Sequence, residues 1–402
     1  MRYAIVGAGV RALHMYAKPL VTELKDSAEL VGIFDVNLTR AKIVSRECGG
    51  IPVFNSFEEM LAISKPETVI VTTVDSLHHE YIIRSLEYGC DVITEKPMTI
   101  DAEKCKAILQ AEKKTGRRVT VTFNLRFAPY MVKIKEILKE NVIGEVLSVD
   151  LEWFLDTRHG ADYFRRWHRR MENSGGLLIT KATHHFDLIN WWLEQEPEEV
   201  FAFGDLRFYG PQREKRGERC LTCAYKDSCE FYWDITKNEF YKEFYLDAEK
   251  EDGYIRDGCV FSEDINIYDN MSVNVKYSGG ALLTYSLVAY SPYEGWRCVL
   301  NGVKGRMEVG EFYSGQRAQE PLERINVYNR KGEVVTYEVE KTGGSHQGAD
   351  VRLRRAIFVG DLGDRYNQKA SSWDGALSVL IGAAANISIK EKRPISVKDL
   401  IQ

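Results

Sequence analysis

Tyr3-Ala4-Ile5-Val6-Gly7-Ala8-Gly9-Val10-Arg11-Ala12 is the stretch that decides the fold. A short apolar run passes directly into a G-x-G-x-x-A pattern, which is typical of a strand that turns tightly into a helix. The first glycine permits the turn, the second leaves the backbone bare beside a pyrophosphate, and the alanine lets helix and strand pack closely. Amide groups at the helix start would hold the phosphates. The pattern predicts a dinucleotide site that uses Gly7, Gly9, Val10 and Arg11; the alternative is a glycine-rich turn without a ligand.

The second apolar run, residues 30–34, ends at an acidic residue, Asp35, which stands 26 positions after Gly9. A carboxylate at this distance accepts hydrogen bonds from the adenosine ribose and repels a 2′-phosphate. The sequence therefore predicts NAD(H) as the cofactor and disfavours NADP(H). Arg40, close by, would soften that preference.

Three further apolar runs follow at residues 68–74, 91–94 and 118–122, with amphipathic stretches between them. Continuous Val and Ile runs separated by helices predict parallel strands that are buried on both faces. We therefore expect an α/β fold that begins with a Rossmann dinucleotide-binding domain over residues 1–122.

The pattern changes in the remainder of the chain. A helical stretch at 129–140 precedes strict alternation of apolar and polar residues at 145–154, 271–277, 325–328 and 334–339. Period-two alternation with short turns predicts an antiparallel sheet that is buried on one face. Residues 123–402 are expected to form an α+β domain with an open-faced, mainly antiparallel sheet. Its last helix should bury an apolar stripe that runs from Trp373 to Ile387.

Composition and charge exclude several classes of protein. The 402 residues carry 54 Lys and Arg against 59 Asp and Glu, a net charge of −5. Such a chain has no overall positive field to recruit nucleic acid or anionic lipid. It has no uninterrupted apolar run of about 18 residues and no signal-peptide pattern at its start. We expect a cytoplasmic protein with neither nucleic-acid nor membrane partners.

Eight cysteines need an explanation, because disulfides are rare in the reducing cytosol. Four are scattered singly and are expected to be small apolar core residues: Cys48, Cys90, Cys105 and Cys298. Cys220, Cys223 and Cys229 form C-x2-C-x5-C, and Cys259 follows within a segment, residues 211–260, that interrupts the strand pattern. Four thiolates would complete a structural zinc site that staples this insertion. Singly packed thiols or a disulfide pair are equally open, whereas iron–sulfur ligation fits the residue types but not the usual spacings.

Three later motifs, in order, resemble the Gfo/Idh/MocA oxidoreductases, the relatives of glucose–fructose oxidoreductase and inositol dehydrogenase. Residues 92–97 end in Glu95-Lys96-Pro97, which looks like the Glu-Lys-Pro signature of that family. Asn124-Leu125-Arg126-Phe127 is similar to the motif that opens the second domain. Gly175-Gly176 with His184-His185-Phe186-Asp187 resembles the third signature, G-G…H-x-x-D.

The resemblance implies an NAD(P)-dependent enzyme that transfers a hydride between the nicotinamide and a hydroxyl carbon of a sugar, polyol or glycoside-like substrate. It also implies a second domain that builds homodimers or homotetramers. Lys96 would lie near the nicotinamide and the reacting hydroxyl, Pro97 would fix the chain, often after a cis peptide bond, and Glu95 would orient the loop. Thr73, His78 and Asn124 would complete the cofactor site.

His184 matches the catalytic histidine of the family. Removal of a hydride from an alcohol needs a base for the hydroxyl proton, and histidine suits this task near neutral pH. A neighbouring Lys96 would depress the pKa of that histidine and stabilise a developing alkoxide. Many relatives carry an aspartate where this chain has Thr180, so we assign the adjacent Lys181 as a catalytic and substrate-anchoring residue; a solvated helix lysine is the alternative.

Two other segments are candidates for the substrate pocket. Residues 163–170 form a dense run of aromatic and basic side chains, which stack on sugars and grip hydroxyls or carboxylates. A solvated loop is the alternative for each. The glycine-rich loop at 343–350 offers His346, whereas Asp350 is expected to cap the following helix. The predicted substrate-binding residues are therefore Lys96, Arg126, Tyr163, Arg166, Trp167, His168, Lys181, His184, His185 and His346.

Two functions of other classes also remain open. The chain could recycle bound NAD to cleave or eliminate a glycoside without net redox change. Alternatively, it could be a non-catalytic NAD-binding regulator, although such a protein would need a broken site and both Lys96 and His184 are present.

Overall fold

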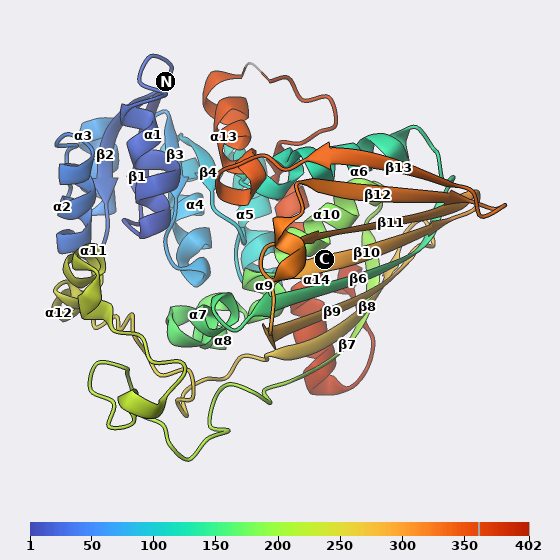
Figure 1. Ribbon diagram of the computed structural model, residues 1–402. Coiled ribbons are helices and arrows are strands. Elements are labelled where there is room, and N and C mark those ends of the chain that lie inside the picture. The colour runs from blue at the N-terminus through green and yellow to red at the C-terminus, as the bar shows by residue number, and fades with distance from the viewer. Residues whose placement is uncertain (361, 402) are drawn as a thin grey trace.

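The computed structural model describes residues 1–360 and 362–401, apart from the side chain of residue 345, and contains two sheets that lie side by side (Figure 1). The first sheet has six strands in the order β14-β5-β4-β3-β1-β2, of which β1 to β5 are parallel. β14 pairs antiparallel with β5, so a late piece of chain completes this sheet. The strands are β1 (Arg2–Val6), β2 (Glu29–Phe34), β3 (Thr68–Val71), β4 (Asp91–Thr94), β5 (Val119–Val121) and β14 (Ala370–Ser371).

Helices cover both faces of this sheet, as expected for a Rossmann fold, and the predicted fold class is confirmed. They are a π-helical segment η1 (Ala12–Ala17), α1 (Lys18–Val21), α2 (Leu38–Glu47), α3 (Phe57–Ser64), α4 (His78–Tyr88) and α5 (Ala102–Thr115). The wide turns of η1 end at Ala17, two residues before Pro19 of α1, which lacks the amide proton that a regular α-helix would use. Gly89 and Gly116 end α4 and α5 in the left-handed conformation.

The second sheet has nine strands in the order β13-β12-β11-β10-β6-β9-β8-β7-β15. All neighbours are antiparallel except β6 and β9, which run parallel. Side chains alternate as predicted: in β8 every second residue from Met271 to Tyr277 is buried. The strands are β6 (Val146–Asp156), β7 (Pro197–Asp205), β8 (Asn270–Tyr277), β9 (Leu282–Ser291), β10 (Gly295–Gly302), β11 (Gly305–Phe312), β12 (Leu322–Asn329), β13 (Val334–Glu340) and β15 (Ile395–Ser396).

Helices separate the two sheets, and the long α14 packs on β7 as well as on α5. Most of α14 is buried on every side rather than along one stripe, and Trp373 departs from the prediction. Its ring is 40% exposed and its Nε1 donates to Glu196 at 2.8 Å. The helices of this part are α6 (Pro129–Lys139), α7 (His159–Arg165), α8 (Met171–Ser174), α9 (Leu177–Thr180), α10 (Thr183–Leu193), α13 (Ala349–Arg354), α14 (Ser372–Glu391) and α15 (Val397–Ile401). Among the described residues, none of the helices has the length and apolar character that a membrane crossing requires.

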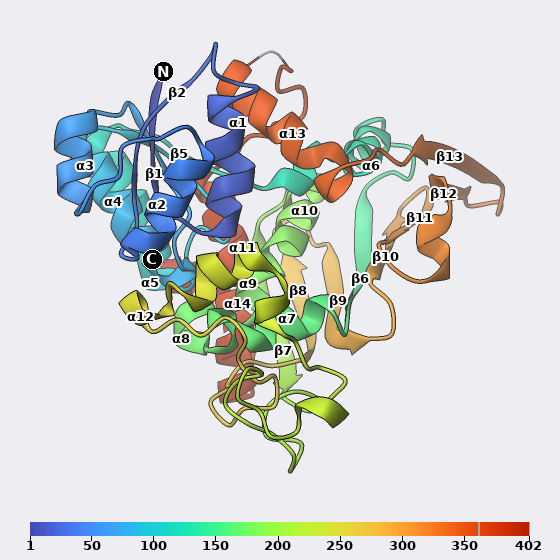
Figure 2. The ribbon, with the colours of Figure 1, turned by 60° about the vertical axis from the view of Figure 1, so that its left-hand side comes forward.

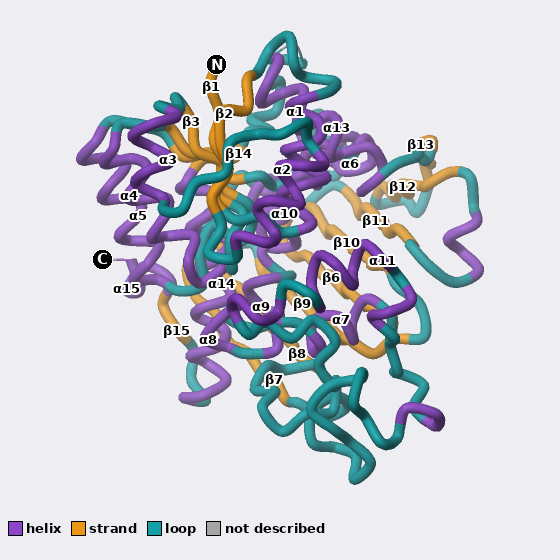
Figure 3. The backbone as a smooth tube through the Cα atoms, turned by 90° about the vertical axis from the view of Figure 1, so that its left-hand side faces the viewer, coloured by secondary structure: helices purple, strands orange, loops and turns teal. Residues whose placement is uncertain are grey.

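The insertion lies between β7 and β8 and is mostly loop in its first half (Figure 3). Its second half contains α11 (Glu239–Tyr241), a π-helical segment η7 (Lys242–Leu246) and α12 (Glu249–Asp252). These short helices leave the second sheet and lie against α2 of the first domain (Figure 2). The sequence predicted only that this segment needs a stabilising cross-link, whereas the structure shows that it also contacts the first domain.

Candidate active site

A cavity of about 990 Å³ lies between the domains, at the carboxyl ends of β1, β2 and β3. The strand order reverses between β1 and β3, which is where open α/β sheets bind ligands. Most of the predicted site residues line this cavity: Gly7, Gly9, Val10, Arg11, Asp35, Arg40, Thr73, His78, Glu95, Lys96, Asn124, Tyr163, Arg166, Trp167, His168, Lys181, His184 and His346.

The glycine turn has the geometry that a dinucleotide needs. Gly7 has φ +94°, and a Cβ there would lie 2.6 Å from the carbonyl carbon of Thr72, so only glycine fits. A Cβ on Gly9, in contrast, would meet no atom within 4 Å. The space beside Gly9 therefore lies open at the start of the following helix, where a pyrophosphate would fit.

Asp35 is fixed at the end of β2 by two backbone amides. Its Oδ2 accepts from Ala8 at 2.6 Å and its Oδ1 from Asn37 at 2.7 Å. Burial raises the pKa of Asp35, although the charge of Arg40 acts in the opposite direction. Arg40 lies 3.7 Å from Asp35 and also pairs with Asp252 of the insertion. Asp35 and Asp252 therefore both lie beside Arg40, the one residue whose charge was predicted to favour a 2′-phosphate.

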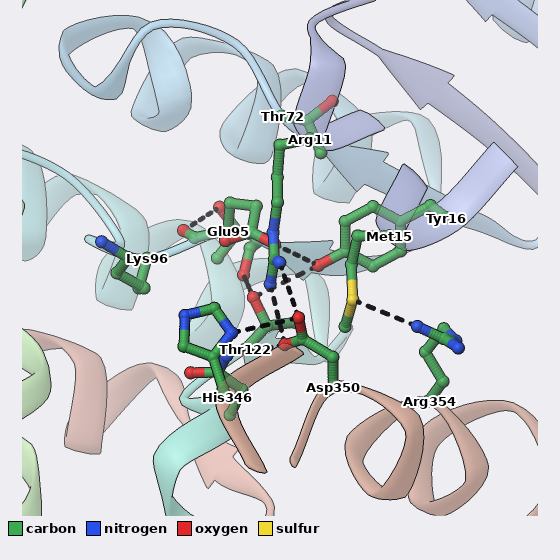
Figure 4. Close-up of polar contacts among 12 residues, drawn as sticks. Arg11, Met15, Tyr16, Thr72, Glu95, Lys96, Thr122, His346, Asp350 and Arg354 are labelled. Atoms are coloured by element: carbon green, nitrogen blue, oxygen red, sulfur yellow. Dashed lines mark hydrogen bonds and ion pairs between the residues drawn. The ribbon is translucent and has the colours of Figure 1, made fainter. Parts of the chain in front are cut away.

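Arg11 is the centre of a network that joins the domains (Figure 4). Its Nε donates to Glu95 at 2.7 Å, and its Nη1 lies 3.1 Å from Asp350 on α13. Tyr16 also donates to Glu95 at 2.7 Å, and Asn124 donates to Asp350 at 2.6 Å. Arg11 therefore spans from the first domain to α13 across the cavity.

The prediction that Asp350 caps its helix is wrong. Gly348 occupies the cap position of α13 without a side-chain hydrogen bond, and the Asp350 carboxylate points to Arg11 instead. His346 also contacts Asp350, with Nδ1 at 3.1 Å from Oδ2. Burial opposes ionisation of Asp350, but the hydrogen bond with His346 and the charge of Arg11 outweigh it and hold its pKa below the ordinary value.

Lys96 lies on the loop after β4, and the Lys96–Pro97 peptide is cis. Its Nζ donates to the carbonyl oxygen of Thr180 at 2.9 Å. Burial lowers the pKa of Lys96, although the carboxylates of Asp75 and Glu95 favour its charged form. Pro97 does not line the cavity; its carbonyl oxygen lies 2.8 Å from Nδ1 of His78, so it contributes through its backbone.

His184 and Lys181 reach the cavity from the second domain. His184 lies in the first turn of α10, is buried, and has an Nδ1 without a hydrogen-bond partner among the described residues. Burial and the charges of Lys96 and Lys181 hold the pKa of His184 well below its usual value. Lys181 lies between α9 and α10, and burial lowers its pKa to about 8. The arrangement places a neutral imidazole, able to accept a proton, among amines of lowered basicity.

Asp75 is a candidate that sequence reasoning missed. It follows β3, is 5% exposed and lines the cavity. Burial raises the pKa of Asp75 to about 7, although a hydrogen bond from Thr180 and the charge of Lys96 lower it. The available signal was its position, because a carboxylate just past a strand of a parallel sheet points to the ligand-binding edge.

Aromatic and charged side chains line the end of the cavity formed by α7 and the turn after it. Arg166 donates to Asp162 at 2.9 Å, and Arg256 contacts the other oxygen of Asp162 at 2.8 Å. Burial opposes ionisation of Asp162, but the two guanidinium groups outweigh it and lower its pKa. The ring of Trp167 stacks on His168 with centroids 3.6 Å apart.

The insertion supplies five lining residues that the sequence did not predict: Tyr241, Tyr245, Asp252, Tyr254 and Arg256. Several contacts hold this segment on α2. The Asn37 amide donates to the carbonyl oxygen of Ala248 at 2.8 Å, and Arg46 pairs with Glu243 at 2.6 Å. Thr39 donates from its backbone to Glu251 at 3.0 Å. The insertion therefore forms a wall of the cavity next to Asp35.

Two predicted substrate-binding residues lie elsewhere, contrary to the prediction. Arg126 is 2% exposed and binds Asp187 through Nε at 2.9 Å and Nη2 at 2.6 Å. His185 stacks on Trp153 at 3.6 Å between centroids, and its Nδ1 lies 2.8 Å from the Tyr285 hydroxyl. Both side chains belong to the interior of the second domain, because neighbours distant in sequence enclose them.

The cysteines divide as expected, but the predicted zinc site is not supported. Cys48, Cys90, Cys105 and Cys298 are buried singly, and all eight thiols are free. Cys220, Cys223, Cys229 and Cys259 line one small cavity. Nevertheless, within residues 1–360 and 362–401, no group of three or more His, Cys, Asp or Glu side chains is disposed to hold a metal ion.

Comparisons with known proteins match the chain along most of its length. The family described as "Oxidoreductase family, NAD-binding Rossmann fold" (GFO_IDH_MocA) matches residues 1–123, and its "C-terminal alpha/beta domain" matches residues 135–397. YteT of Bacillus subtilis (strain 168), which is named as an oxidoreductase, is 41% identical over 98% of this chain and 97% of its own. D-glucoside 3-dehydrogenase of Escherichia coli (strain K12) is 30% identical over 46% of this chain and 52% of its own.

A solved structure shows the same fold. The WlbA dehydrogenase of Bordetella pertussis, in complex with NADH and UDP-GlcNAcA, superposes with a TM-score of 0.68 at 18% identity. The superposition covers 98% of both chains. It therefore includes both domains, and not the nucleotide-binding fold alone.

Proposed function

Because the chain belongs to the Gfo/Idh/MocA oxidoreductase family, we propose that it transfers a hydride between NAD(H) and a hydroxyl carbon of a sugar, polyol or glycoside-like substrate. The observation that carries this proposal is the convergence of Lys96, Asp75 and His184 on one cavity whose other part holds the glycine turn. When bound, NAD+ would accept the hydride.

His184 takes the proton of the substrate hydroxyl in this proposal. Its imidazole is neutral because burial and two lysines depress its pKa, so it is ready to accept a proton. His184 lines the cavity, and its Nδ1 is buried without a partner among the described residues. Lys96 stabilises the developing alkoxide, and Thr180 positions it through the 2.9 Å hydrogen bond from Nζ. Lys181 adds positive charge and anchors the substrate.

The cofactor is NAD(H) rather than NADP(H) in this proposal. Asp35 would accept hydrogen bonds from the adenosine ribose, and Asp252 places a second carboxylate beside Arg40. A related fold in complex with NADH supports this assignment.

A sugar or polyol fits the substrate end of the cavity. Trp167 and Tyr163 offer flat faces for C–H surfaces, and Arg166 offers donors for hydroxyl groups. One relative is named a D-glucoside 3-dehydrogenase, and one structural neighbour holds a nucleotide sugar.

We further propose a cytoplasmic homodimer or homotetramer. Eight free thiols suit a reducing compartment. The open face of the second sheet exposes Phe203 (63%) and Leu282 (56%), which a second copy would cover. Analytical ultracentrifugation of the purified protein tests the subunit number, and a monomer at micromolar concentration would contradict it.

The test of the proposed function is a substrate panel. Purified protein with NAD+ is offered sugars, inositols and alkyl glycosides, and NADH formation is followed by its absorbance. We expect turnover with at least one member and loss of about 10²-fold or more in kcat for H184N. Protein that binds NADH but gives no turnover, redox or otherwise, would favour a regulatory role.

The insertion covers the cofactor cavity near Asp35, and this favours a second candidate reaction, which the same substrate panel tests. Contacts of the insertion with Asn37, Thr39 and Arg46 would slow the release of NAD, as a cycle without net redox change requires. Cleavage of an aryl glycoside without accumulation of NADH would assign the chain to this NAD-recycling class.

A further inference from the structure

The charged side chains that line the cavity are balanced in one part and unbalanced in another. Around the glycine turn and the end of β2, each arginine has acidic partners: Arg11 lies beside Glu95 and Asp350, Arg40 lies beside Asp35 and Asp252, and Arg354 pairs with Glu23. Four other cations line the cavity together with only two carboxylates: Lys96, Lys181, Arg166 and Arg256 with Asp75 and Asp162. This second group therefore carries an excess of positive charge.

Asp162 is shared by two guanidinium groups, so it cannot neutralise both of them. Arg166 Nη1 donates to Asp162 Oδ2 at 2.9 Å, and Arg256 Nη2 lies 2.8 Å from Asp162 Oδ1. Within residues 1–360 and 362–401, no second acidic side chain forms an ion pair with either arginine. One of the two positive charges therefore lacks a counter-ion in this part of the chain.

Asp75, the second carboxylate of the group, supplies little negative charge near neutral pH. Burial raises the pKa of Asp75 to about 7, although a hydrogen bond from Thr180 and the charges of Lys96 and Arg166 lower it. At pH 7 this carboxyl group is therefore about half protonated. Lys181, whose pKa burial lowers to about 8, is still mostly protonated at the same pH. The excess of positive charge thus persists under physiological conditions.

The charge of Arg166 also acts on the groups that are proposed to carry out the chemistry. Burial lowers the pKa of Lys96, and the charges of Arg11 and Arg166 add to this effect. Burial and the charges of Arg166 and Lys96 also hold the pKa of His168 well below its ordinary value. A cleft with an excess of one charge attracts ligands of the opposite charge. An anion bound here would lie in the same part of the cavity as Lys96.

Both guanidinium groups are held in place by their surroundings. The guanidinium carbon of Arg256 lies 4.9 Å from the ring centre of Trp233 and 5.7 Å from that of Tyr245, and its side chain is 11% exposed. Arg166 follows α7 directly, and its side chain lines the cavity and is 34% exposed. A guanidinium of fixed orientation binds a carboxylate through two parallel hydrogen bonds. Arg166 is thus placed for direct contact, and Arg256 supplies the second charge.

We propose that the substrate carries a carboxylate group, as a sugar acid of the uronate type does, and that Arg166 and Arg256 recognise it. The bound carboxylate is the second counter-ion that the two arginines lack. The assignment of this anion to the substrate rests on the proposed function, which leaves the other groups of the substrate open. The pyrophosphate of the cofactor is the competing source of negative charge, and the experiment separates the two.

The experiment compares each uronate with the neutral sugar that differs from it only at the carboxylate. D-Glucuronate and D-glucose, D-galacturonate and D-galactose, and the methyl glycosides of all four are offered to the full-length protein. Calorimetry gives their affinity for the complex with NADH, and absorbance gives their turnover with NAD+. We expect at least one uronate to bind, and to react in kcat/KM, about tenfold or more better than its neutral counterpart. Added salt should weaken the uronate and spare the neutral sugar.

Arginine variants connect this preference to the two side chains. R166Q and R256Q should each weaken binding of the preferred uronate about tenfold. R213Q is the matched control and should keep the preference, because Arg213 belongs to the same insertion as Arg256 but pairs with Glu230 at 2.7 Å and does not line the cavity. The Kd for NADH is measured alongside, since loss of a pyrophosphate contact would raise it.

The proposal is overturned if no uronate of the panel is preferred over its neutral counterpart. It is also overturned if R166Q and R256Q raise the Kd for NADH about tenfold and leave the uronate preference intact, because the arginines then serve the cofactor. The wild-type comparison decides the matter even where a variant fails to fold. Turnover of neutral sugars without a preference for any uronate leaves the proposed function standing and refutes the carboxylate site. A preferred uronate that binds without forming NADH supports the carboxylate site and contradicts the proposed function.

Discussion

The contact between Arg40 and Asp252 predicts how the protein discriminates between its two candidate cofactors. Asp252 comes from the insertion and pairs with Arg40, whose guanidinium also lies 3.7 Å from Asp35. Both carboxylates would face the 2′-position of a bound adenosine. The informative change is D252N, which removes one charge, keeps the shape and leaves Asp35 in place.

The magnitude follows from the charge that is removed. A unit charge about 6 Å from a 2′-phosphate, at an effective dielectric constant of about 20, is worth roughly 3 kcal/mol. The Asp252 side chain is 17% exposed, so solvent and salt screen about half of this interaction. The remaining ~1.4 kcal/mol corresponds to a tenfold change in relative affinity. We expect D252N to strengthen NADPH binding about tenfold relative to NADH.

The assay is a fluorescence titration that gives Kd for NADH and NADPH in parallel. D247N is the matched control, since Asp247 belongs to the same insertion but pairs with Lys242 at the surface. The reasoning is refuted if the ratio of the two Kd values stays within twofold of wild type. It is also refuted if D247N shifts that ratio as far as D252N does. High salt should shrink the effect, because it screens the same charge.

Four other predictions follow from the same structure. K96A should lower kcat about 10²-fold or more with NADH affinity nearly unchanged, as measured by initial rates and titration; equal kcat would exclude Lys96 from the chemistry. G9A should fold normally, because a Cβ there meets no atom within 4 Å, and should raise the Kd for NADH at least about tenfold. G7A should be less stable than wild type, because its Cβ meets the Thr72 backbone. R126M should lower the free energy of unfolding by about 3–5 kcal/mol by leaving Asp187 buried without its partner, and R126M/D187L should recover part of that loss in chemical denaturation. The folded-state pKa of Asp75 is about 7, above the ordinary 3.8, so protonated Asp75 stabilises the fold below pH 4, and this contribution of up to about 4 kcal/mol is lost as the pH rises through 7. The Tm of D75N should therefore rise relative to that of wild type between pH 4 and pH 8. A Tm difference that stays constant over this range would contradict the pKa shift.

Local pattern predicted the parts of the site that a few consecutive residues define. The glycine turn needs only the strand before it and the helix after it, and Lys96 and His184 lie in short motifs. Burial of parallel strands and alternation in the second sheet are also local signals, which is why the fold class could be predicted. The parallel pairing of β6 and β9 could not, because it joins strands more than 100 residues apart.

The errors arose where the partner lies far along the chain. Arg126 was assigned to substrate from a motif, yet Asp187, 61 residues later, neutralises it in the interior. Asp350 has a good position for a cap, but Arg11, 339 residues earlier, attracts its carboxylate. The wall formed by Asp252 and Tyr254 was missed for the same reason, because its contacts with α2 span more than 200 residues. The spacing of residues along one helix carries no information about partners that lie so far away in the sequence.

Arg11 shows how the cofactor motif also governs the relation between the domains. It occupies a variable position of G-x-G-x-x-A, where its side chain was expected to serve the dinucleotide. Instead it bridges Glu95 of the first domain and Asp350 of α13, while Arg40 and Arg46 bind carboxylates of the insertion. These pairs link the first domain to two separate parts of the second across one cavity. Opening the cavity at either edge must therefore break charge pairs. Substrate exchange that leaves these pairs intact requires less free energy than a release of the cofactor that breaks them.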